Sequence, residues 1–502
     1  MSLLGLDVGT TGCKAIVFSE EGQILSSAYR EYPLVFPRPG WIELDPNLVW
    51  QAVEETIKAA VSAAPRKDPV RALAASVQGE AVCPVDSAGN PLANSIVTFD
   101  SRTLPQAEQL RQAVGEERVY QVSGQPLHPM GTVLKIAWWR QEQPQVYERA
   151  ARFVCYGDFV LLKLGLPPVM DESMAARTMG YDIHRHDWCE DILEALRIDR
   201  EKLPQVAQSG TAIGEIPCRV CEQLGLPRGV LACTGGHDQP CGALGAGAVF
   251  PGRAMYAIGT VECLTPALPS FNPSLGRQGF PCYPHVAPGQ YVTLGFNFGG
   301  GSVLRWFRDN FARAEVERAR ETGRDPYDLM LQPLDTRPGK LLLLPHFAGT
   351  GTPWLDPLAK GAIVGLTLAS TPQDILKAIL EGTTYEIALN LHRMQEAGVA
   401  VHEVRAIGGG TKSPKWLQIK ADILGLELSV PAVSEAACLG AAILAGCGAR
   451  IYDDAASAAD RLARPVAHFA PDAVHAARHQ ERLAIYQKLY PALREIVHAL
   501  EA

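Results

Sequence analysis

The sequence predicts an α/β protein of two related lobes around a central cleft, and three observations support this fold class. Residues 3–29 alternate apolar strands with short glycine turns, which is a β-meander, and a helical pattern begins at Pro46. A similar strand–turn–strand pattern recurs over residues 254–265. Between the two copies, the small residues of 245–252 end in a Pro-Gly breaker. Because a meander followed by a helix is the first half of a ribonuclease-H-like layout, we expect two such lobes.

The elements are predicted in chain order as follows. The first lobe has strands at 3–8, 13–18 and 24–29, followed by a helix that Asp45 caps and Pro46 begins. The second lobe has strands at 254–258, 262–265 and 404–407, a helix from Pro372 to Gly398, and a helix from Pro414 to Gly425. Residues from Asp453 onward show a helical pattern. We therefore divide the chain into residues 1–248, residues 249–450 and a C-terminal helical extension, residues 451–502.

Composition excludes several classes of protein. The chain has 502 residues, 47% hydrophobic and 20% charged, with a net charge of −8, which argues against a protein that coats nucleic acid or an anionic membrane. No apolar stretch suits a membrane helix and the N-terminus does not resemble a secretory leader, so we expect a cytoplasmic protein. Its 12 cysteines are widely spread and predict no disulfide framework. The Cys218–Cys221 pair lacks a second pair at zinc spacing.

The first candidate site is the segment 7–14, in which an acid ends a strand, a tight turn follows, and Lys14 follows the turn. Backbone N–H groups and hydroxyls of such a turn can surround a phosphate, while Asp7 can hold Mg²⁺ directly or through water. The segment fits an ordinary glycine hairpin equally well. Neither the Gly-x4-Gly-Lys-Ser/Thr loop nor a dinucleotide-binding Gly-x-Gly-x-x-Gly occurs in the chain.

The second candidate site is residues 230–240, which predict a strand, a glycine turn and a helix beginning at Asp238. A carboxylate at a helix N-terminus is often only a cap. Here Gly235 and Gly236 suggest room for a substrate, and Asp238 could then accept the proton of an attacking hydroxyl. We interpret His237 as a packing or orienting residue.

Two further segments place polar or glycine residues after apolar strands. The loop 408–410 precedes a capped helix, where backbone can approach a nucleoside or an α-phosphate closely. Residues 76–80 and 98–102 could bind several hydroxyls of a sugar or polyol, although a polar surface loop is the better explanation for either one taken alone.

Together these segments resemble the FGGY family of carbohydrate kinases, within the actin, hexokinase and Hsp70 ATPase superfamily. Residues 7–14 resemble its first phosphate motif and residues 257–260 its second. Residues 130–138 and the stretch from 361 to 382 are similar to the two family signatures, while 408–414 and 440–442 resemble its adenosine segment. The resemblance covers the chain from Leu3 to about Gly446.

The resemblance implies phosphorylation of a sugar hydroxyl by ATP and Mg²⁺ in a cleft between lobes that close. By this analogy Asp238 is the general base, and Asp7 and Asp238 organise the metal. The residues expected around the nucleotide are Gly9, Thr10, Thr11, Lys14, Gly259, Thr260, Gly408, Gly409, Gly410 and Thr411. The residues expected in the sugar pocket are Gln78, Glu80 and Asp100. A homodimer is compatible with the sequence, which predicts neither a nucleic-acid nor a membrane partner.

Two departures from the family pattern bear on the substrate. Residues 78–80 lack the Met-His pair typical of xylulose kinases and keep only the acid of the Arg-Glu pair of glycerol kinases. Residues 349–353 read Gly-Thr-Gly-Thr-Pro where many relatives have Gly-Glu-Arg-Thr-Pro. A ketose such as xylulose is the favoured substrate, and a polyol of the glycerol or erythritol type is the alternative. The competing class is a non-enzymatic actin-like nucleotide switch, which would have no evident use for polar residues at 78–80 and 100.

Overall fold

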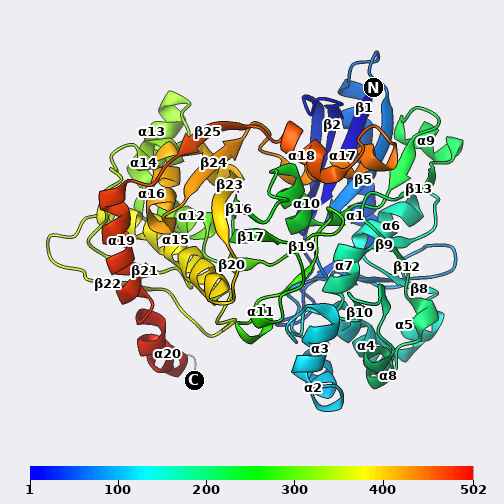
Figure 1. The fold of residues 1–502 in the computed structure, drawn as a ribbon, viewed down its shortest axis with the longest axis horizontal. Coiled ribbons are helices and arrows are strands. Elements are labelled where there is room, and N and C mark those ends of the chain that lie inside the picture. The colour runs from blue at the N-terminus through cyan, green and yellow to red at the C-terminus, as the bar shows by residue number, and fades with distance from the viewer. Residues whose placement is uncertain (501–502) are drawn as a thin grey trace.

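The computed structural model describes residues 1–500 and has two lobes, each built around a mixed β-sheet (Figure 1). The N-terminal sheet has the order β13-β14-β5-β1-β2-β3, and β15 also pairs with β5. The C-terminal sheet has the order β18-β19-β17-β16-β23-β24-β25, and β20 also pairs with β17. The predicted pair of α/β lobes is confirmed.

The N-terminal meander forms as predicted. Strand β1 (Ser2–Val8) pairs antiparallel with β2 (Gly12–Ser19), which pairs antiparallel with β3 (Ile24–Glu31). Strand β5 (Val70–Val77) pairs parallel with β1. Helix α1 (Pro46–Ala63) begins where the Asp45 side chain accepts a hydrogen bond from the Asn47 N–H. This capping satisfies one of the unpaired N–H groups of the first turn.

The C-terminal lobe repeats this arrangement. Strands β16 (Gly252–Ile258) and β17 (Glu262–Leu268) pair antiparallel, and β23 (Val401–Ile407) lies parallel to β16. Helix α15 (Pro372–Glu396) begins at a capping box of Thr371 and Asp374. Helix α16 (Pro414–Leu424) is capped by Ser413 and ends at Gly425, whose φ of +64° is the left-handed conformation expected after a helix.

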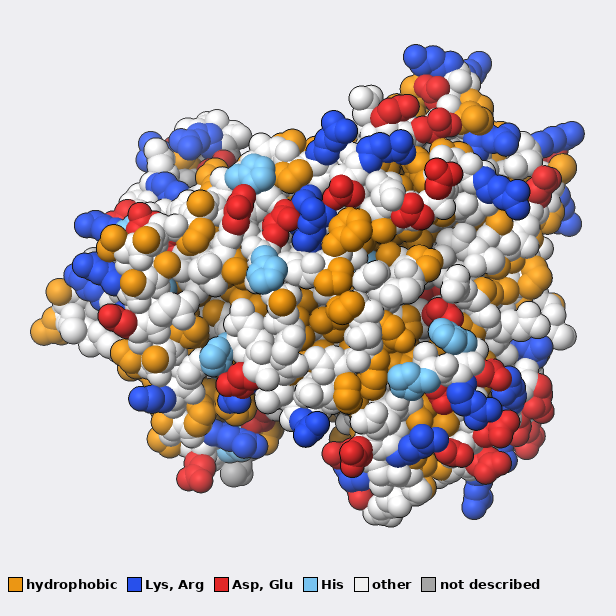
Figure 2. Space-filling model, in the orientation of Figure 1, with side chains coloured by type: hydrophobic (Ala, Val, Ile, Leu, Met, Phe, Trp, Pro, Cys, Tyr) orange, Lys and Arg blue, Asp and Glu red, His pale blue; other side chains and the backbone are white. Residues whose placement is uncertain are grey.

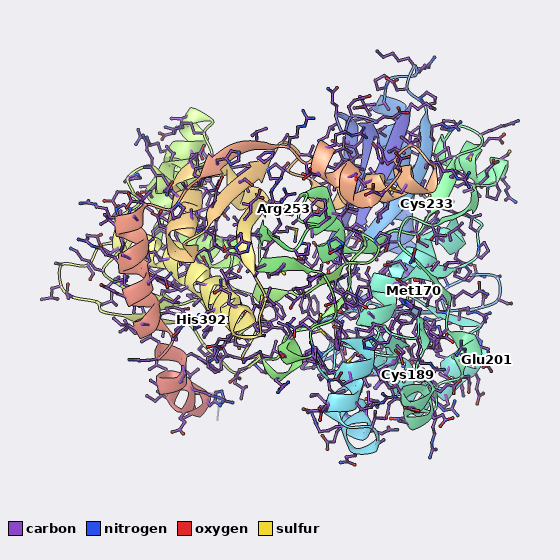
Figure 3. All side chains as sticks on the ribbon, in the orientation of Figure 1. Met170, Cys189, Glu201, Cys233, Arg253 and His392 are labelled. Carbon is purple, nitrogen blue, oxygen red and sulfur yellow. The ribbon has the colours of Figure 1, made fainter. Side chains whose placement is uncertain are left out.

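Helix α17 (Ala436–Gly448) belongs to the second half of the sequence but packs on the N-terminal sheet (Figure 1). A Cβ on Gly5 would lie 1.9 Å from the Cys438 carbonyl oxygen, and one on Gly440 would lie 2.0 Å from that of Cys241. Cys233, labelled in Figure 3, contacts the same helix through the Ala445 carbonyl oxygen at 3.8 Å. The small residues 440–442, expected in an adenosine segment, are therefore buried packing residues between α17, β1 and α10.

The predicted C-terminal helical extension is confirmed for the described residues and also contains a strand. It comprises α18 (Ala455–Leu462), β25 (Pro465–Phe469), α19 (Ala473–Tyr486) and α20 (Leu489–Ala499). Strand β25 pairs antiparallel with β24 (Glu427–Pro431) at the edge of the C-terminal sheet. Arg253, labelled between the lobes in Figure 3, contacts Asp460 of α18 at 2.7 Å. Residues 501–502 lie outside the described part.

The remaining elements surround these two sheets. The other helices of eight or more residues are α2 (Leu104–Ala113), α3 (Glu116–Ser123), α4 (Thr132–Glu142), α6 (Tyr156–Lys163), α10 (Asp238–Gly245), α12 (Gly301–Phe311) and α13 (Arg313–Thr322). The shorter helices are α5 (Pro144–Arg149), α7 (Glu172–Arg177), α8 (Glu190–Leu196), α9 (Cys218–Leu224), α11 (Ser274–Arg277), α14 (Pro326–Leu331) and the 3-10 turns 200–202 and 409–412. The short strands are β4 (Glu43–Leu44), β6 (Cys83–Val85), β7 (Ser95–Ile96), β8 (Arg152–Val154), β9 (Val169–Asp171), β10 (Tyr181–Asp182), β11 (Asp187–Trp188), β12 (Gln205–Ala207), β13 (Ala212–Glu215), β14 (Leu231–Cys233), β15 (Gly236–His237), β18 (Tyr283–Pro284), β19 (Tyr291–Val292), β20 (Gly295–Asn297), β21 (Leu342–Leu344) and β22 (Ala362–Val364).

The distribution of surface charge and the state of the cysteines agree with what the composition predicts. Figure 2 shows basic and acidic side chains interspersed over the visible face, without a large area of one sign. All 12 cysteines are free thiols, including exposed Cys218 and buried Cys221 on α9. Across residues 1–500, the helices are too short or too polar to cross a membrane.

Candidate active site

Asp238 begins α10, directly after the short strand β15, and its side chain is 34% exposed. His237 Nε2 lies 3.1 Å from Asp238 Oδ1, and His237 Nδ1 lies 2.9 Å from the Tyr283 hydroxyl. Burial raises the pKa of Tyr283 and lowers that of His237 well below its usual value, so the first stays protonated and the second stays neutral. Tyr283 therefore donates to Nδ1, which leaves the imidazole proton on Nε2, facing Asp238.

The pKa of Asp238 is raised to about 7, first by burial and then by the negative charges of Asp7 and Glu80. Arg177 opposes this shift. A carboxylate whose pKa lies near neutral pH is suited to accept a proton and to release it again.

The two glycines before Asp238 serve packing, which corrects the expectation that they leave room for a substrate. A Cβ on Gly235 would lie 1.8 Å from the Ala75 carbonyl oxygen of β5. A Cβ on Gly236 would lie 2.2 Å from Val286. Because these positions lack side chains, the polypeptide can run close beside β5, with which β15 pairs in parallel, and this close packing fixes where α10 begins.

Asp7 lies near the end of β1, where it pairs in register with Lys14 of β2. Its Oδ1 accepts a hydrogen bond from Ser76 Oγ at 3.0 Å, and burial raises its pKa. In the turn that follows, the Gly9 N–H donates to the Gly12 carbonyl oxygen at 3.0 Å. Thr10 is half-buried and Thr11 is exposed. The structure thus places a carboxylate and a hydroxyl-bearing turn beside Asp238.

Lys14, expected at the phosphates, has a partner from the second half of the chain. Its Nζ lies 2.6 Å from Oε2 of Glu435, which precedes α17. A phosphate at this position would share Lys14 with Glu435.

Glu80 has an unusual backbone conformation, with φ of +56°, that only a surrounding network can hold. Buried Lys135 and Thr132, both on α4, donate to its carbonyl oxygen at 2.9 and 3.2 Å. Burial lowers the pKa of Lys135 to about 8. The first family signature, which contains these residues, therefore acts here by holding Glu80 in place.

The carboxylate of Glu80 forms an ion pair with Arg177 at the end of α7. Gly79 makes room for His237, because a Cβ there would lie 2.9 Å from His237 Nε2, whereas Arg177 Nε, at 3.9 Å, would be at ordinary contact distance. Gln125 Oε1 accepts from Arg177 Nη1 at 2.7 Å. Within the described residues, the buried atoms Gln125 Nε2 and Arg177 Nε have no hydrogen-bond partner and are available to a ligand.

Glu80 and Arg177 face a cavity between the lobes. The residues that line it are Glu80, Gln125, Pro126, His128, Met130, Arg177 and Met179 from the N-terminal lobe, and Gly279, Pro281, Leu294, Phe296, Thr352 and Leu355 from the C-terminal lobe. Burial lowers the pKa of His128 to about 4, so its ring is neutral near pH 7. The cavity therefore combines one compensated ion pair with apolar walls.

Asp100 does not line this cavity, and its predicted place in the sugar pocket is wrong. Its buried carboxylate is bound by Arg102 Nε and Nη2 at 2.9 and 2.7 Å, and by the Ile42 N–H at 2.7 Å. The Arg102 guanidinium lies over the Trp41 ring at 3.9 Å and the Trp138 ring at 4.9 Å. Both oxygens of Asp100 are thus used within the N-terminal lobe.

Gln78 connects the first hairpin to the end of β5. Its Nε2 donates to the Gly9 carbonyl oxygen at 3.0 Å, while its Oε1 is buried without a partner in the described chain. It is not among the residues that line the cavity.

A second, larger pocket of about 530 Å³ lies in the C-terminal lobe, which is within the usual volume of small-molecule sites. Four of the expected nucleotide residues line it: Gly259, Thr260, Gly409 and Gly410. Gly408, with φ of +90°, and Thr411, whose hydroxyl donates to the Gly408 carbonyl oxygen at 2.8 Å, shape the turn instead. Lys412 and Ser413 of the expected adenosine segment also line it. The lining residues that the sequence did not indicate are Gly301, Leu304, Arg305, Asp325, Tyr327, Asp328, Leu331 and Trp416.

The donor set at the cleft fits a magnesium ion that also binds phosphates. Asp7 and Asp238 are two carboxylates close enough for one charge to raise the pKa of the other. Within residues 1–500 no group of three His, Cys, Asp or Glu side chains could enclose a metal. Mg²⁺ typically takes one or two carboxylates together with substrate phosphates, so two acids beside a phosphate turn are sufficient.

Sequence reasoning missed Arg177, His128 and Tyr283. Arg177 lies on a six-residue helix without a motif, and Tyr283 comes from the opposite lobe. Their roles depend on contacts between segments far apart in the chain, for which the sequence carries no local signal.

Fold and site together define a two-lobed protein of the actin-like ATPase fold, with a largely apolar cavity between the lobes, a carboxylate of raised pKa at Asp238, and a larger pocket in the C-terminal lobe. Residues 2–245 match the N-terminal domain of the FGGY family of carbohydrate kinases, and residues 256–449 match its C-terminal domain. The chain belongs to the FGGY family of carbohydrate kinases.

Relatives within the family differ in the substrate that their names give. A xylulose kinase of Bacillus subtilis strain 168 is 26% identical over 100% of this chain and 99% of its own length. A gluconokinase of the same strain is 30% identical over 88% of this chain and 86% of its own length. A glycerol kinase of Methylibium petroleiphilum is 33% identical over 90% of this chain and 91% of its own length. The crystal structure of a ligand-bound xylulose kinase from Lactobacillus acidophilus shares the fold, with a TM-score of 0.88, 24% identity and 98% coverage of both chains.

Proposed function

We propose that this carbohydrate kinase transfers the γ-phosphoryl group of ATP to a hydroxyl of a small neutral sugar, a ketose such as xylulose, with Asp238 as the general base. The observation that carries the proposal is the position of Asp238. Its carboxylate is partly exposed, is oriented by His237 and Tyr283, and has a pKa of about 7.

Phosphoryl transfer requires little covalent chemistry from the protein. A base must accept the proton of the attacking hydroxyl, and the two substrates must be held in line. The Asp238 carboxylate would take that proton. Its raised pKa limits the energetic cost of the protonated state, and because this pKa is only about 7 the proton can still pass to water near neutral pH.

The nucleotide would occupy the larger pocket, with backbone of Gly259, Gly409 and Gly410 against it. The N-terminal turn 9–12 and Lys14 would approach the phosphates from the other lobe. Asp7 and Asp238 would hold Mg²⁺, which when bound neutralises phosphate charge.

The charge of the cavity supports a neutral sugar. Among its lining residues the ionised side chains are Glu80 and Arg177, which compensate each other, and His128 is neutral. An aldonate such as gluconate would bring a carboxylate to a cavity with no uncompensated cation, close to the acids Asp7 and Asp238. A polyol is the alternative acceptor, because Glu80 and Arg177 together could bind two neighbouring hydroxyls.

The test is ADP release in a coupled assay with D-xylulose, D-gluconate and glycerol. We expect D-xylulose to be the best acceptor, and Asp238→Asn to lower kcat by about 10²–10⁴-fold while the dissociation constant for ATP changes little. Asp454→Asn, at the exposed N-terminus of α18, is the matched control. Retention of a tenth of wild-type turnover in Asp238→Asn would remove Asp238 from the role of base. Absence of sugar-dependent ADP release would favour the nucleotide switch.

A further inference from the structure

The loop 349–358 forms part of the C-terminal wall of the cavity. Thr352 and Leu355 line the cavity on the side opposite Glu80 and Arg177. The Thr352 hydroxyl oxygen accepts from the Phe296 N–H at 2.8 Å, and Phe296 lines the same wall. A change in the position of this loop would therefore change the shape of the cavity.

The loop is closed by a few internal hydrogen bonds. The Thr350 N–H donates to the Asp356 carbonyl oxygen at 2.9 Å, and the Asp356 N–H donates to Thr350 Oγ1 at 2.8 Å. Leu355 has φ of +48°, a left-handed conformation that is unfavourable for a leucine. Contacts from outside the loop must therefore help to hold it.

Those contacts come from the C-terminal helix α20. The Tyr490 hydroxyl donates to Asp356 Oδ2, and His498 Nε2 lies 2.7 Å from the same oxygen. Arg494 Nε lies 3.5 Å from it. The Tyr490 ring also packs edge-on against Trp354, with ring centroids 5.3 Å apart.

Asp356 links the helix to the loop because its two oxygens have different partners. Oδ2 faces α20, whereas Oδ1 accepts from the Leu358 N–H at 3.0 Å. Asp356 is 8% exposed, so the contact is shielded from water and screened little by salt. The hydrogen bonds of Tyr490 and His498 keep the pKa of Asp356 below its usual value although burial alone would raise it.

We propose that α20 is a positioning element of the sugar site, in which Tyr490 and His498 act through Asp356 on the loop 349–358. The proposal rests on the proposed function, since it assigns the cavity to the sugar. It gives the C-terminal extension a role that its sequence did not suggest. The nucleotide pocket shares none of these residues, so the effect is specific to the sugar.

The kinetic test uses Tyr490→Phe and His498→Leu in the full-length chain, with D-xylulose as acceptor. Each variant removes a polar contact to Asp356 Oδ2 and keeps an apolar side chain of similar size. We expect the KM for D-xylulose to rise about tenfold, the cost of one charge-assisted hydrogen bond, while the KM for ATP stays within about twofold. His468→Leu is the matched control, because His468 contacts Glu427 of β24 at 2.9 Å, away from the loop.

Hydrogen–deuterium exchange of the peptide that covers 349–358 tests the link without turnover. We expect faster exchange in both variants and unchanged exchange in His468→Leu. Unchanged exchange of this peptide in Tyr490→Phe and His498→Leu overturns the proposal, and so does faster exchange with an unchanged sugar KM. If the wild-type chain phosphorylates no sugar, the proposed function fails, and exchange still decides whether α20 holds the loop.

Discussion

The two lobes carry the same hairpin with different chemistry. In each lobe a strand pairs antiparallel with the next strand and parallel with a later one, β1 with β2 and β5, and β16 with β17 and β23. The register places Asp7 opposite Lys14 in the first hairpin, and Ala257 opposite Cys263 at the corresponding pair of the second. The acid and the cation near the cleft therefore belong to the N-terminal lobe alone.

The second hairpin has an acid, but it serves stability. Glu262 is fully buried, its Oε1 lies 2.8 Å from Lys420 Nζ, and its Oε2 accepts from Tyr256 at 2.5 Å. Asp7, by contrast, is only partly buried and has the Ser76 hydroxyl as its hydrogen-bond donor. Two hairpins of one layout thus use a carboxylate for different purposes.

The loops after the parallel strands differ in the same way. The segment after β5 contains Gln78, Gly79 and Glu80, of which Glu80 lines the cavity between the lobes. The segment after β23 is Gly408–Gly410, which presents backbone to the larger pocket. The duplicated scaffold fixes the position of each loop, and the residues in the loop determine what it presents to the neighbouring pocket.

The largest effect that follows from this comparison is expected for Asp7→Asn. If only the first of the two hairpins supplies a metal-binding acid, beside Asp238 of α10, this substitution lowers kcat about a hundredfold or more and raises the Mg²⁺ concentration needed for half-maximal activity. Steady-state kinetics with a Mg²⁺ titration measure both. Wild-type kcat and wild-type Mg²⁺ dependence in this variant would show that the difference between the hairpins has no catalytic meaning.

Glu262→Gln is expected to lower the free energy of unfolding and to leave catalysis largely unchanged. Removal of one partner leaves Lys420 buried without its counter-ion, which costs about 3–5 kcal/mol of unfolding free energy. Urea denaturation measures the loss, and kcat of the folded fraction should stay near wild type. The double variant Glu262→Gln/Lys420→Met should regain much of this stability. A single variant as stable as wild type would mean that the pair contributes little.

The local patterns predicted the scaffold well and the site in part. Strand–turn periodicity located both hairpins, and caps such as Asp45 and Ser413 located helix starts. Asp100 was misassigned because a strand-end carboxylate has the same appearance in sequence whether it faces a cavity or Arg102. The glycines at 235–236 and the small residues at 440–442 were misread because close packing and ligand approach both require small side chains. Only the tertiary contacts distinguish these cases.

The acid limb of the pH–rate profile should report the pKa of Asp238, to which Asp7 of the first hairpin contributes. Asp238 must be deprotonated to act as a base, and burial together with Asp7 and Glu80 raises its pKa to about 7. We therefore expect kcat/KM for the sugar to be nearly constant above this pH and to fall about tenfold per unit below it. Measurements from about pH 5.5 to 8.5 at saturating ATP test this. A flat profile across that range would place the pKa of the base elsewhere.

Gly409→Ala should have the smallest effect of these changes. It tests whether the backbone of the loop after β23 contacts the nucleotide, separately from whether the turn keeps its shape. A Cβ at this position meets no protein atom within 4 Å, whereas one on Gly410 would lie 2.2 Å from the Ile258 side chain. The added methyl group of Gly409→Ala would occupy space in the nucleotide pocket, so we expect the KM for ATP to rise about fivefold with little change in Tm. Gly410→Ala, the matched variant, should lower Tm because Ile258 must move. If Gly409→Ala leaves the KM for ATP unchanged, the loop after β23 does not present its backbone to the nucleotide, and the division of ligands between the two lobes would need another basis.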